Sequence, residues 1–403
     1  MATEINYYDN SNVHGDWQGN APFYPKDDYT LAARLFGESR INIEEAAAIA
    51  RTSPEALEGQ LVQDGVITRR KILVCGGAGF IGSNFIHHIL QKYPYYEVIN
   101  YDKLTYAGNL DNLKNVERNP RYSFMLGDIA DAEKLEEAAG LGLSLVVNFA
   151  AETHVGRSVM FRADEFVRTN VLGTHTLLEM VKRHPEIERF VHVSTDEVYG
   201  TVGLDESYRF SEESPFMPNV PYAAAKAGGD LLARAYFQSY KTPVIVTHCS
   251  NNYGPYQHPE KFLPNSLFRL MRNQPIMLHG AGQHVRDWIF VQDHCEALDA
   301  ALHFGTPGEV YNIGADNELS TSEIARFLLT MLGKPQTLVT FVPDRPGNDL
   351  RYSISAEKIK KELGWAPRHT FGEALTETIR WYENNLDWVE SIKERDQEHA
   401  KYI

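Results

Sequence analysis

The chain has 403 residues, of which 43% are hydrophobic and 23% are charged, and this ordinary globular composition excludes a disordered or collagen-like chain. Its 54 acidic and 39 basic residues leave a net charge of −15. Without clustered Lys and Arg the chain is a poor candidate for binding nucleic acid or anionic lipid, so we expect a small-molecule partner. At roughly 100–200 residues per domain, two or three domains are expected.

We expect neither a membrane segment nor a disulfide framework. No uncharged apolar run reaches the ~18 residues of a membrane helix, and the N-terminal residues lack the basic and apolar regions of a signal peptide. Cys75, Cys249 and Cys295 lie far apart, which predicts buried thiols and no metal site. These features predict a soluble, cytoplasmic protein.

Residues 1–70 form an N-terminal extension of unknown role. Its first 28 residues are polar, aromatic and irregular, and residues 38–65 predict two short helices. Ser53 is placed as the N-cap before Pro54, and Gly65 closes the second helix. A helix-turn-helix is the alternative, but 6 basic against 11 acidic residues disfavour DNA binding. A packing or oligomer role is favoured.

From Arg70 onward, short apolar runs alternate with helical patterns such as 173–184 and 223–240. Continuous apolar runs are typical of strands buried on both faces of a parallel sheet. We therefore predict a doubly wound, Rossmann-like α/β domain over 71–250. A smaller substrate lobe follows over 251–403, with a terminal helix over 371–385. Six strand candidates precede the lobe, at 71–77, 97–102, 122–128, 144–152, 190–195 and 243–250. A seventh, at 309–315, belongs to the part of the lobe near 308–315 that returns to the sheet.

Gly76, Gly79 and Gly82 follow the first predicted strand and open a helix. The first glycine permits a tight turn, the second lets backbone N–H groups approach a pyrophosphate, and the third allows close helix packing. Asp102 ends the second predicted strand about 20 residues later, where an acid accepts hydrogen bonds from a ribose and repels a 2′-phosphate. NAD is therefore favoured over NADP. Asp128 ends the third strand and is either an adenine contact or a surface acid.

Tyr222 and Lys226 stand four residues apart at the start of a predicted helix. Positions i and i+4 share a helix face, so the Lys226 ammonium can lower the pKa of the Tyr222 phenol. A tyrosinate there can take a hydroxyl proton while hydride leaves to a nicotinamide. Behind the glycine motif, this pair resembles the short-chain dehydrogenase/reductase superfamily in its extended form, which acts on nucleotide sugars. Asn170 matches a structural Asn of that superfamily.

Thr195, Asp196 and Glu197 follow the end of a predicted strand. Adjacent carboxylic acids at the mouth of an apolar strand are costly unless they do chemistry, and their pKa values can be pushed apart so that one is an acid and the other a base. The Thr-Asp-Glu run resembles the dTDP-glucose 4,6-dehydratases. Sugar epimerases of the superfamily usually lack both acids here, and nucleotide-glucuronate decarboxylases usually keep only the Glu.

The resemblance extends from about residue 71 to about residue 388 and implies the catalytic roles. Tyr222 would take the proton of the sugar 4-hydroxyl while the C4 hydride passes to NAD, with Lys226 keeping Tyr222 anionic and Thr195 bound to the same oxygen. Glu197 would remove the C5 hydrogen of the resulting 4-ketone, and Asp196 would protonate the departing 6-hydroxyl. The hydride would return to C6.

The motifs and the resemblance together assign the binding residues. The expected NAD contacts are Gly76, Gly79, Phe80, Ile81, Gly82, Asp102, Lys103, Thr105, Asp128, Ile129, Ala150, Ala151, Thr169, Tyr222 and Lys226. The expected substrate contacts are Thr153, Asn251, Lys261, Pro264, Arg286, Asn348 and Tyr352, with Arg286 gripping the diphosphate. Asn348 stands where the family usually has His.

The sequence thus predicts a nucleotide-sugar 4,6-dehydratase acting on dTDP-glucose or a UDP-sugar. Thymine and uracil differ by one methyl group, worth only ~1 kcal/mol of apolar contact. An NAD-dependent epimerase or decarboxylase, or a non-catalytic nucleotide-sugar binder, is the alternative. The helix over 222–240 carries more apolar residues than one buried face requires, and a homodimer is expected.

Overall fold

The computed structural model describes residues 26–37, 41, 43–66, 69–93, 95–154, 158–159, 163–344 and 347–400. The chain forms two compact units, Met1–Ile67 and Thr68–Ile403. The first 28 residues were predicted to be irregular, and residues 1–25 of that segment lie outside the described residues. None of the described helices is both long and apolar enough to cross a membrane.

The described part of the N-terminal unit contains helices α1 (Lys26–Gly37), α2 (Ile43–Ala50) and α3 (Pro54–Gln63). The two predicted helices are confirmed: Ser53 Oγ accepts the Ala56 N–H at 3.2 Å, and Gly65 has a φ of 66°. Helix α1 was not predicted, because its polar first turn hides a short apolar face. The helices pack on a small core of Ala32, Phe36, Ile43, Ala46, Leu57 and Leu61.

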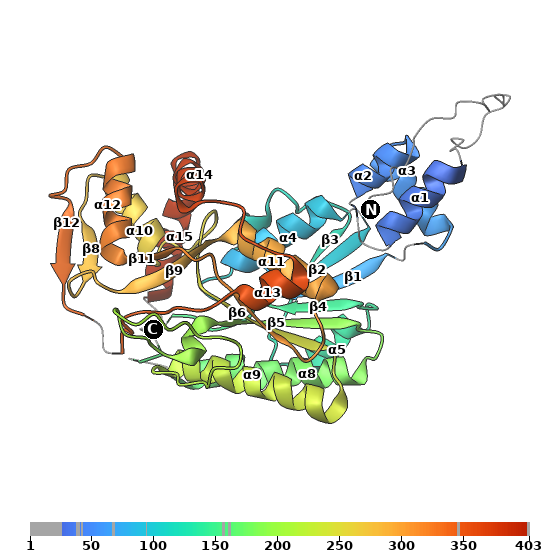
Figure 1. The fold of residues 1–403 in the computed structure, drawn as a ribbon, viewed down its shortest axis with the longest axis horizontal. Coiled ribbons are helices and arrows are strands. Elements are labelled where there is room, and N and C mark those ends of the chain that lie inside the picture. The colour runs from blue at the N-terminus through green and yellow to red at the C-terminus, as the bar shows by residue number, and fades with distance from the viewer. Residues whose placement is uncertain are drawn as a thin grey trace, which may run out of the picture. The chain divides into compact units, whose positions relative to one another are not determined.

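A parallel sheet of seven strands forms the centre of the second unit, in the order β10-β6-β5-β4-β1-β2-β3 (Figure 1). Every predicted strand is present, so the doubly wound Rossmann-like fold is confirmed. The strands are β1 (Arg70–Cys75), β2 (Tyr96–Asp102), β3 (Tyr122–Leu126), β4 (Leu145–Asn148), β5 (Arg189–Thr195), β6 (Val244–Cys249) and β10 (Val310–Ile313).

Successive side chains of a strand point to opposite faces, and β1 shows this directly. Ile72 and Val74 join the core under α4 (Phe80–Lys92) and α11 (Val291–Phe304), whereas Leu73 and Cys75 join the core on the other face. Figure 1 shows α8 and α9 along that other face. Its helices and turns are α5 (Ala132–Ala139), α7 (Ala163–Phe166), a π-helical segment (Val167–Gly173), α8 (Thr174–Arg183) and α9 (Pro221–Tyr240).

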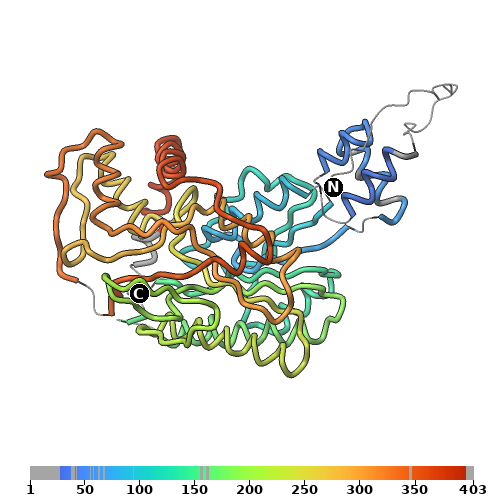
Figure 2. Tube along the Cα trace, viewed as in Figure 1, coloured from blue at the N-terminus to red at the C-terminus, as the bar shows by residue number. Residues whose placement is uncertain are grey.

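The C-terminal lobe is built from the yellow-to-red part of the trace in Figure 2. It holds two small sheets, of order β11-β9-β7 and β12-β8, that the sequence did not predict. Their strands are β7 (Asn251–Tyr253), β8 (Ile276–His279), β9 (Val285–Phe290), β11 (Glu318–Ser320) and β12 (Val339–Val342). The helices are α10 (Phe262–Met271), α12 (Thr321–Met331), α13 (Glu357–Leu363), α14 (Phe371–Asn384) and α15 (Leu386–Ala400). The helix predicted to be terminal is α14, and α15 follows it.

Candidate active site

Two adjoining cavities lie at the carboxyl ends of the main-sheet strands, where open α/β sheets bind their ligands. The sheet-edge cavity is bounded by the turn after β1, by the ends of β2, β4, β5 and β6, and by the start of α9. The lobe cavity is bounded mainly by residues of the C-terminal lobe. Thr153, Glu197, Asn251 and Lys261 belong to the walls of both. A ligand can therefore extend from one cavity into the other.

The glycine turn forms the floor of the sheet-edge cavity. Gly76 has a φ of 74°, which favours glycine, and a Cβ on Gly82 would lie 2.3 Å from the Gly76 carbonyl oxygen. The tight turn and close helix packing predicted for the first and third glycines are both present. Helix α4 begins at Phe80 directly after Gly79, and no side chain caps its N-terminus. Its free N–H groups suit a pyrophosphate.

Asp102 closes the adenosine side of this cavity and is only 8% exposed. Its two carboxylate oxygens accept the N–H groups of Ala78 at 3.0 Å and Leu104 at 2.8 Å. Each oxygen keeps a second acceptor site for a ribose hydroxyl, whereas a 2′-phosphate would meet a like charge. The glycine turn, the α4 N-terminus and Asp102 together fit NAD.

Tyr222 and Lys226 lie on the first turns of α9 and line the same cavity. Lys226 Nζ donates to the Val193 carbonyl at 2.7 Å, and burial lowers the pKa of Lys226. Burial and the nearby Glu197 carboxylate raise the pKa of Tyr222 well above its usual value, although the Thr195 hydroxyl opposes this shift. The predicted lowering of the Tyr222 pKa is therefore wrong for the protein alone, because desolvation outweighs the opposing hydrogen bond from Thr195.

Asp196 and Glu197 stand in the 3₁₀ turn (Asp196–Tyr199) that follows β5, and Thr195 Oγ1 caps that turn by accepting the Glu197 N–H at 3.3 Å. Burial and the neighbouring Glu197 raise the pKa of Asp196 well above its usual value. Burial also raises the pKa of Glu197, but Arg286 and Lys261 oppose the shift. The adjacent acids therefore differ in environment: Asp196 is the better proton donor and Glu197 the better base.

Arg286 lies on β9 in the wall of the lobe cavity. Its guanidinium donates to the carbonyls of Val285 at 2.8 Å and Asp349 at 2.9 Å, and stacks 4.2 Å from the centre of the Tyr352 ring. The Tyr352 hydroxyl donates to Glu197 Oε2 at 3.4 Å. Arg286, the predicted phosphate-binding arginine, thus stacks on Tyr352, and Tyr352 in turn contacts Glu197.

Most of the remaining assigned residues also line these cavities. Asn348 belongs to the lobe cavity, and the sheet-edge walls include Phe80, Ile81, Lys103, Thr105, Ile129, Ala150, Ala151 and Thr169. Two assigned residues lie outside both walls. Asp128 Oδ1 accepts the Ala130 N–H at 2.9 Å and its Oδ2 lies 3.4 Å from Arg168. Pro264 is buried in α10 between two residues that line the lobe cavity.

A buried polar network beneath the catalytic residues was not predicted from the sequence. Asp230, one helical turn after Lys226 on α9, accepts from Ser194 Oγ at 2.8 Å and lies 3.2 Å from His248 Nε2. Its other oxygen lies 3.5 Å from His192 Nε2. Burial alone would raise the pKa of Asp230, but these histidines hold it below its usual value. The network joins α9 to β5 and β6 directly behind the site.

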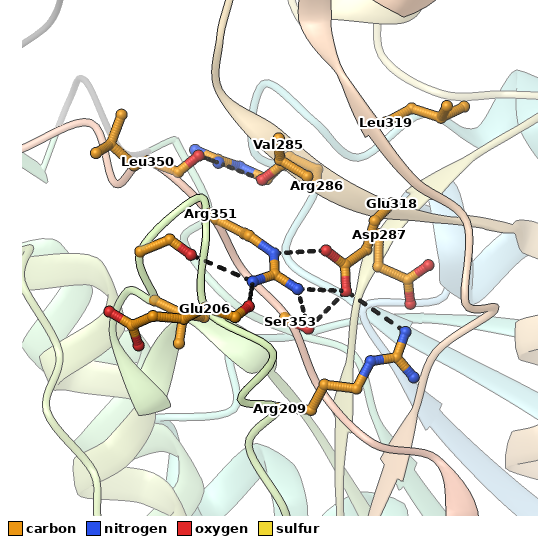
Figure 3. Close-up of polar contacts among 12 residues, drawn as sticks. Glu206, Arg209, Val285, Arg286, Asp287, Glu318, Leu319, Leu350, Arg351 and Ser353 are labelled. Carbon is orange, nitrogen blue, oxygen red and sulfur yellow. Dashed lines mark hydrogen bonds and ion pairs between the residues drawn. The ribbon is translucent and has the colours of Figure 1, made fainter.

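A second network supports the strand that carries Arg286 (Figure 3). Arg351 Nε donates to Glu318 Oε2 at 2.6 Å, and Ser353 Oγ donates to Glu318 Oε1 at the same distance. Glu318 lies on β11, which pairs with β9 so that Leu319 faces Arg286. Burial would raise the pKa of Glu318, but Arg351 and Ser353 hold it below its usual value.

Comparison with known proteins agrees with this geometry. Residues 73–378 match the family model described as GDP-mannose 4,6 dehydratase. A dTDP-glucose 4,6-dehydratase of Streptomyces niveus is 46% identical over 331 residues, which cover 81% of this chain and 97% of that protein.

Solved structures give the same result. The dTDP-glucose 4,6-dehydratase of Bacillus anthracis in complex with NAD has a TM-score of 0.75 and 48% identity, covering 80% of this chain and 99% of that one. DesIV, a dTDP-glucose 4,6-dehydratase of Streptomyces venezuelae solved with NAD bound, has a TM-score of 0.76 and 46% identity, covering the same shares. The chain therefore belongs to the GDP-mannose 4,6 dehydratase family and, within it, stands with the dTDP-glucose 4,6-dehydratases.

Proposed function

We propose that the protein is an NAD-dependent hydro-lyase that converts dTDP-glucose to the 4-keto-6-deoxy sugar. The observation that carries this proposal is the meeting of two kinds of chemistry in one cavity. Tyr222 and Lys226 line it together with the glycine turn, and so do the buried Asp196 and the half-buried Glu197, which precede Tyr222 in the chain. The similar proteins that are dTDP-glucose 4,6-dehydratases support the choice of dTDP-glucose as the substrate.

Held at the glycine turn and Asp102, NAD would supply the acceptor for the C4 hydride and the donor that reduces C6. Tyr222 takes the proton of the 4-hydroxyl, and the Thr195 hydroxyl hydrogen-bonds the phenol oxygen and favours its anion. The Lys226 ammonium is fixed by the Val193 carbonyl. Lys226 also lines the cavity, one helical turn from Tyr222, and its charge would stabilise the phenolate in the loaded site.

The acid pair performs the elimination. A ketone at C4 acidifies the C5 hydrogen, and Glu197 removes it because Arg286 and Lys261 favour its carboxylate. Asp196 is held protonated by burial and by Glu197, so it delivers a proton to the departing 6-hydroxyl. Glu197 returns its proton to C5 when C6 is reduced, and the proton that Tyr222 took from the 4-hydroxyl replaces, through solvent, the one that Asp196 gave to the departing hydroxyl. The net loss from the sugar is therefore one water.

Arg286 and Lys261 provide the positive charge of the substrate-side wall. The Arg286 guanidinium is immobilised by backbone carbonyls and by the Tyr352 ring, and this fits a diphosphate because a fixed planar fork can grip two phosphate oxygens at once. Thr153, Asn251, Asn348 and Tyr352 line the same cavity and complete the proposed substrate contacts.

Product analysis by NMR tests this function. The purified protein is incubated with a panel of dTDP- and UDP-sugars, and we expect a C6 methyl signal and loss of the C4 proton with dTDP-glucose. Deuterium from heavy water should appear at C5. A product that keeps its 6-hydroxyl and changes only its C4 configuration would favour an epimerase, and loss of carbon dioxide from a glucuronate would favour a decarboxylase. Tight binding without turnover of any sugar would leave a binding protein.

We further propose a homodimer that pairs the outer faces of α9 and the π-helical segment. Apolar side chains remain exposed there, including Leu231 at 57% and Tyr240 at 58% on α9, and Val167 at 54% on the π-helical segment. Patches of this kind mark association surfaces. Light scattering should give twice the 45.7 kDa chain mass, and Leu231→Lys should shift it toward one chain. A parent protein that stays monomeric would refute the proposal.

A cytoplasmic setting and a division of labour between the parts complete the proposed function. The three buried free thiols support a reducing compartment. We assign NAD binding to residues 71–250 and substrate binding to 251–403, with β10 returned to the main sheet. The N-terminal extension of residues 1–70 is assigned no part in the chemistry.

A further inference from the structure

Helix α15 is hydrogen-bonded to the glycine turn through two asparagines. Trp388 Nε1 donates to Asn112 Oδ1 at 2.9 Å, and Asn112 Nδ2 donates to the Ala78 carbonyl at 3.0 Å. Arg395 Nη1 donates to Asn109 Oδ1 at 3.2 Å, and the Asn109 N–H donates to the same Ala78 carbonyl at 2.9 Å. Because Ala78 lies inside the turn between Gly76 and Gly82, α15 and the phosphate-binding backbone form one connected network.

Within the part of the chain that the structure describes, only the oxygen of the Asn109 side-chain amide is hydrogen-bonded. Its oxygen accepts from Arg395 and from the Asp111 N–H at 3.1 Å. Its nitrogen is buried and has no acceptor among the described residues, although Asn109 is only 4% exposed. A buried donor without an acceptor is costly and rare. Asn109 lines the sheet-edge cavity, so the acceptor it lacks belongs to whatever fills that cavity.

Trp388 and a further residue of α15, Ile392, line the same cavity. The Trp388 ring is held by its bond to Asn112 and by the Trp381 ring, whose centre lies 5.0 Å away. The family match ends at residue 378, before α15 begins at Leu386. The helix therefore adds a wall to the sheet-edge cavity.

We propose that α15 is part of the cofactor site, with Arg395 orienting Asn109 so that its amide nitrogen donates to an oxygen of the phosphate–ribose backbone of NAD. Trp388 and Ile392 form the wall over that backbone. Arg395 is a positioning residue, since it acts through Asn109. The inference rests on the proposed function only in requiring that the protein binds NAD.

Two variants test the donor and its support. Asn109→Asp keeps the acceptor oxygen for Asp111 and Arg395, but it removes the donor and places a negative charge beside the phosphates. Arg395→Gln leaves the Asn109 oxygen bonded to the Asp111 N–H but removes the guanidinium that fixes the amide from α15. For each we expect the Kd for NAD to rise about 10- to 100-fold, the loss typical of a hydrogen bond to a charged group. Calorimetric titration of the NAD-stripped protein measures the Kd, and assay of nucleotide retained through gel filtration checks it.

Glu390→Gln is the matched control, because it removes the α15 ion pair with Arg272 without touching the cavity. We expect its Kd for NAD to stay within about twofold of the parent value. Melting temperatures measured without NAD identify any variant that has not folded. Such a variant is replaced by Trp388→Phe, which keeps an aromatic ring in the wall but loses the N–H that donates to Asn112. A parental Kd in Asn109→Asp or in Arg395→Gln overturns the inference. A parent protein that binds no NAD overturns the proposed function instead.

Discussion

At the scale of single residues, burial raises the pKa of Tyr222, Asp196 and Glu197 together, and the charges around each decide their different roles. Tyr222 faces carboxylates, Asp196 faces Glu197, and Glu197 faces Arg286 and Lys261. In the proposed reaction, oxidation at C4 and elimination at C5–C6 therefore use different groups of one cavity. Variants of these groups should stop the reaction at different stages.

Tyr222→Phe should block C4 oxidation, so that substrate produces no NADH absorbance. Glu197→Gln should allow oxidation but slow C5 proton removal by about 10²–10⁴-fold, the usual loss for an acid–base group. That variant should accumulate enzyme-bound NADH and lose C5 exchange in deuterated water. Stopped-flow absorbance with mass spectrometry of the recovered sugar separates the stages. Dehydration at the parental rate by Glu197→Gln would show that the carboxylate takes no part.

Asp196→Asn should raise the stability of the fold while it lowers activity. The pKa of Asp196 is raised on folding, so between the ordinary and the raised pKa the native state holds a proton that the unfolded state has lost. Native stability from this group therefore falls as pH rises above the ordinary Asp value of about 4. The variant should gain about 1–2 kcal/mol over the parent at pH 8 and less at pH 5. Urea unfolding at the two pH values measures this, and a gain that does not grow with pH would contradict it.

The sequence predicts the catalytic residues better than it predicts their surroundings. Thr195, Asp196 and Glu197 are consecutive, and Tyr222 and Lys226 are one helical turn apart, so local spacing identifies them. The network around Asp230 joins it to histidines at positions 192 and 248. Those partners meet only when β5 and β6 pair, and no local pattern marks them. The raised Tyr222 pKa depends on desolvation, which spacing does not reveal.

At the scale of elements, Asp230 ties α9 to the two strands behind it. Asp230→Asn should lower the pKa of Lys226, which Asp230 raises against burial. The alkaline limit of the kcat/KM profile should then move to lower pH, and stability should fall by about 2–4 kcal/mol because the histidines lose their charged partner. The groups facing this pair are Tyr222 on α9, His192 on β5, and His248 and Cys249 on β6.

Asp299→Asn is the control for this experiment. Asp299 is equally buried on α11 and bonds His88, Lys92 and Tyr93 of α4, with none of these residues in either cavity wall. We expect a comparable loss of stability in urea with the alkaline limit unmoved. If both variants shift the profile equally, the shift reports loosened packing, and Asp230 has no specific effect on Lys226.

Arg351→Met should weaken the sheet that presents Arg286. The change removes the nearer of two arginines that pair with Glu318 and leaves Arg209, at 3.4 Å, as the remaining paired arginine of this partly buried carboxylate. We expect a loss of about 2–3 kcal/mol together with a higher KM for the sugar nucleotide. Because the pKa of Glu318 is lowered on folding, the loss should be full above about pH 5 and shrink as pH falls and Glu318 protonates. Arg272→Met, at an exposed pair, should cost at most about 1 kcal/mol. Equal losses in both variants would contradict this account of Arg351.

The elements themselves divide by length and patterning. Six of the seven central strands are apolar runs that are mostly buried, which is why they are visible in the sequence. The edge strand β3 is also apolar in sequence, although three of its five residues are exposed. The lobe strands are edge pieces such as Asn251–Tyr253 and Glu318–Ser320, three residues long and partly polar, whose pairing depends on distant partners. Helix α15 has a polar surface that masks the few positions, Trp388 and Ile392, with which it reaches the cavity.

At the scale of the whole molecule, every residue that lines the two cavities lies between positions 76 and 392, within the unit that begins at Thr68. A variant that begins at Thr68 should therefore fold and retain dehydration within about twofold of the full chain. Thermal unfolding and the NMR assay check the two statements, with light scattering on both proteins. A large loss of activity, or a change in oligomeric state, would assign the N-terminal extension to the site or to the interface.

The position of β10 has a consequence for how the enzyme is made. Its residues, 310–313, pair with β6, which ends at Cys249, so some sixty residues of the other lobe separate two neighbouring strands. During translation the backbone groups on that side of β6 stay unpaired until this distant segment leaves the ribosome. An unpaired strand edge invites association with other chains. Nascent chains that stall between residues 250 and 310 should accordingly be the species that aggregate and that chaperones bind.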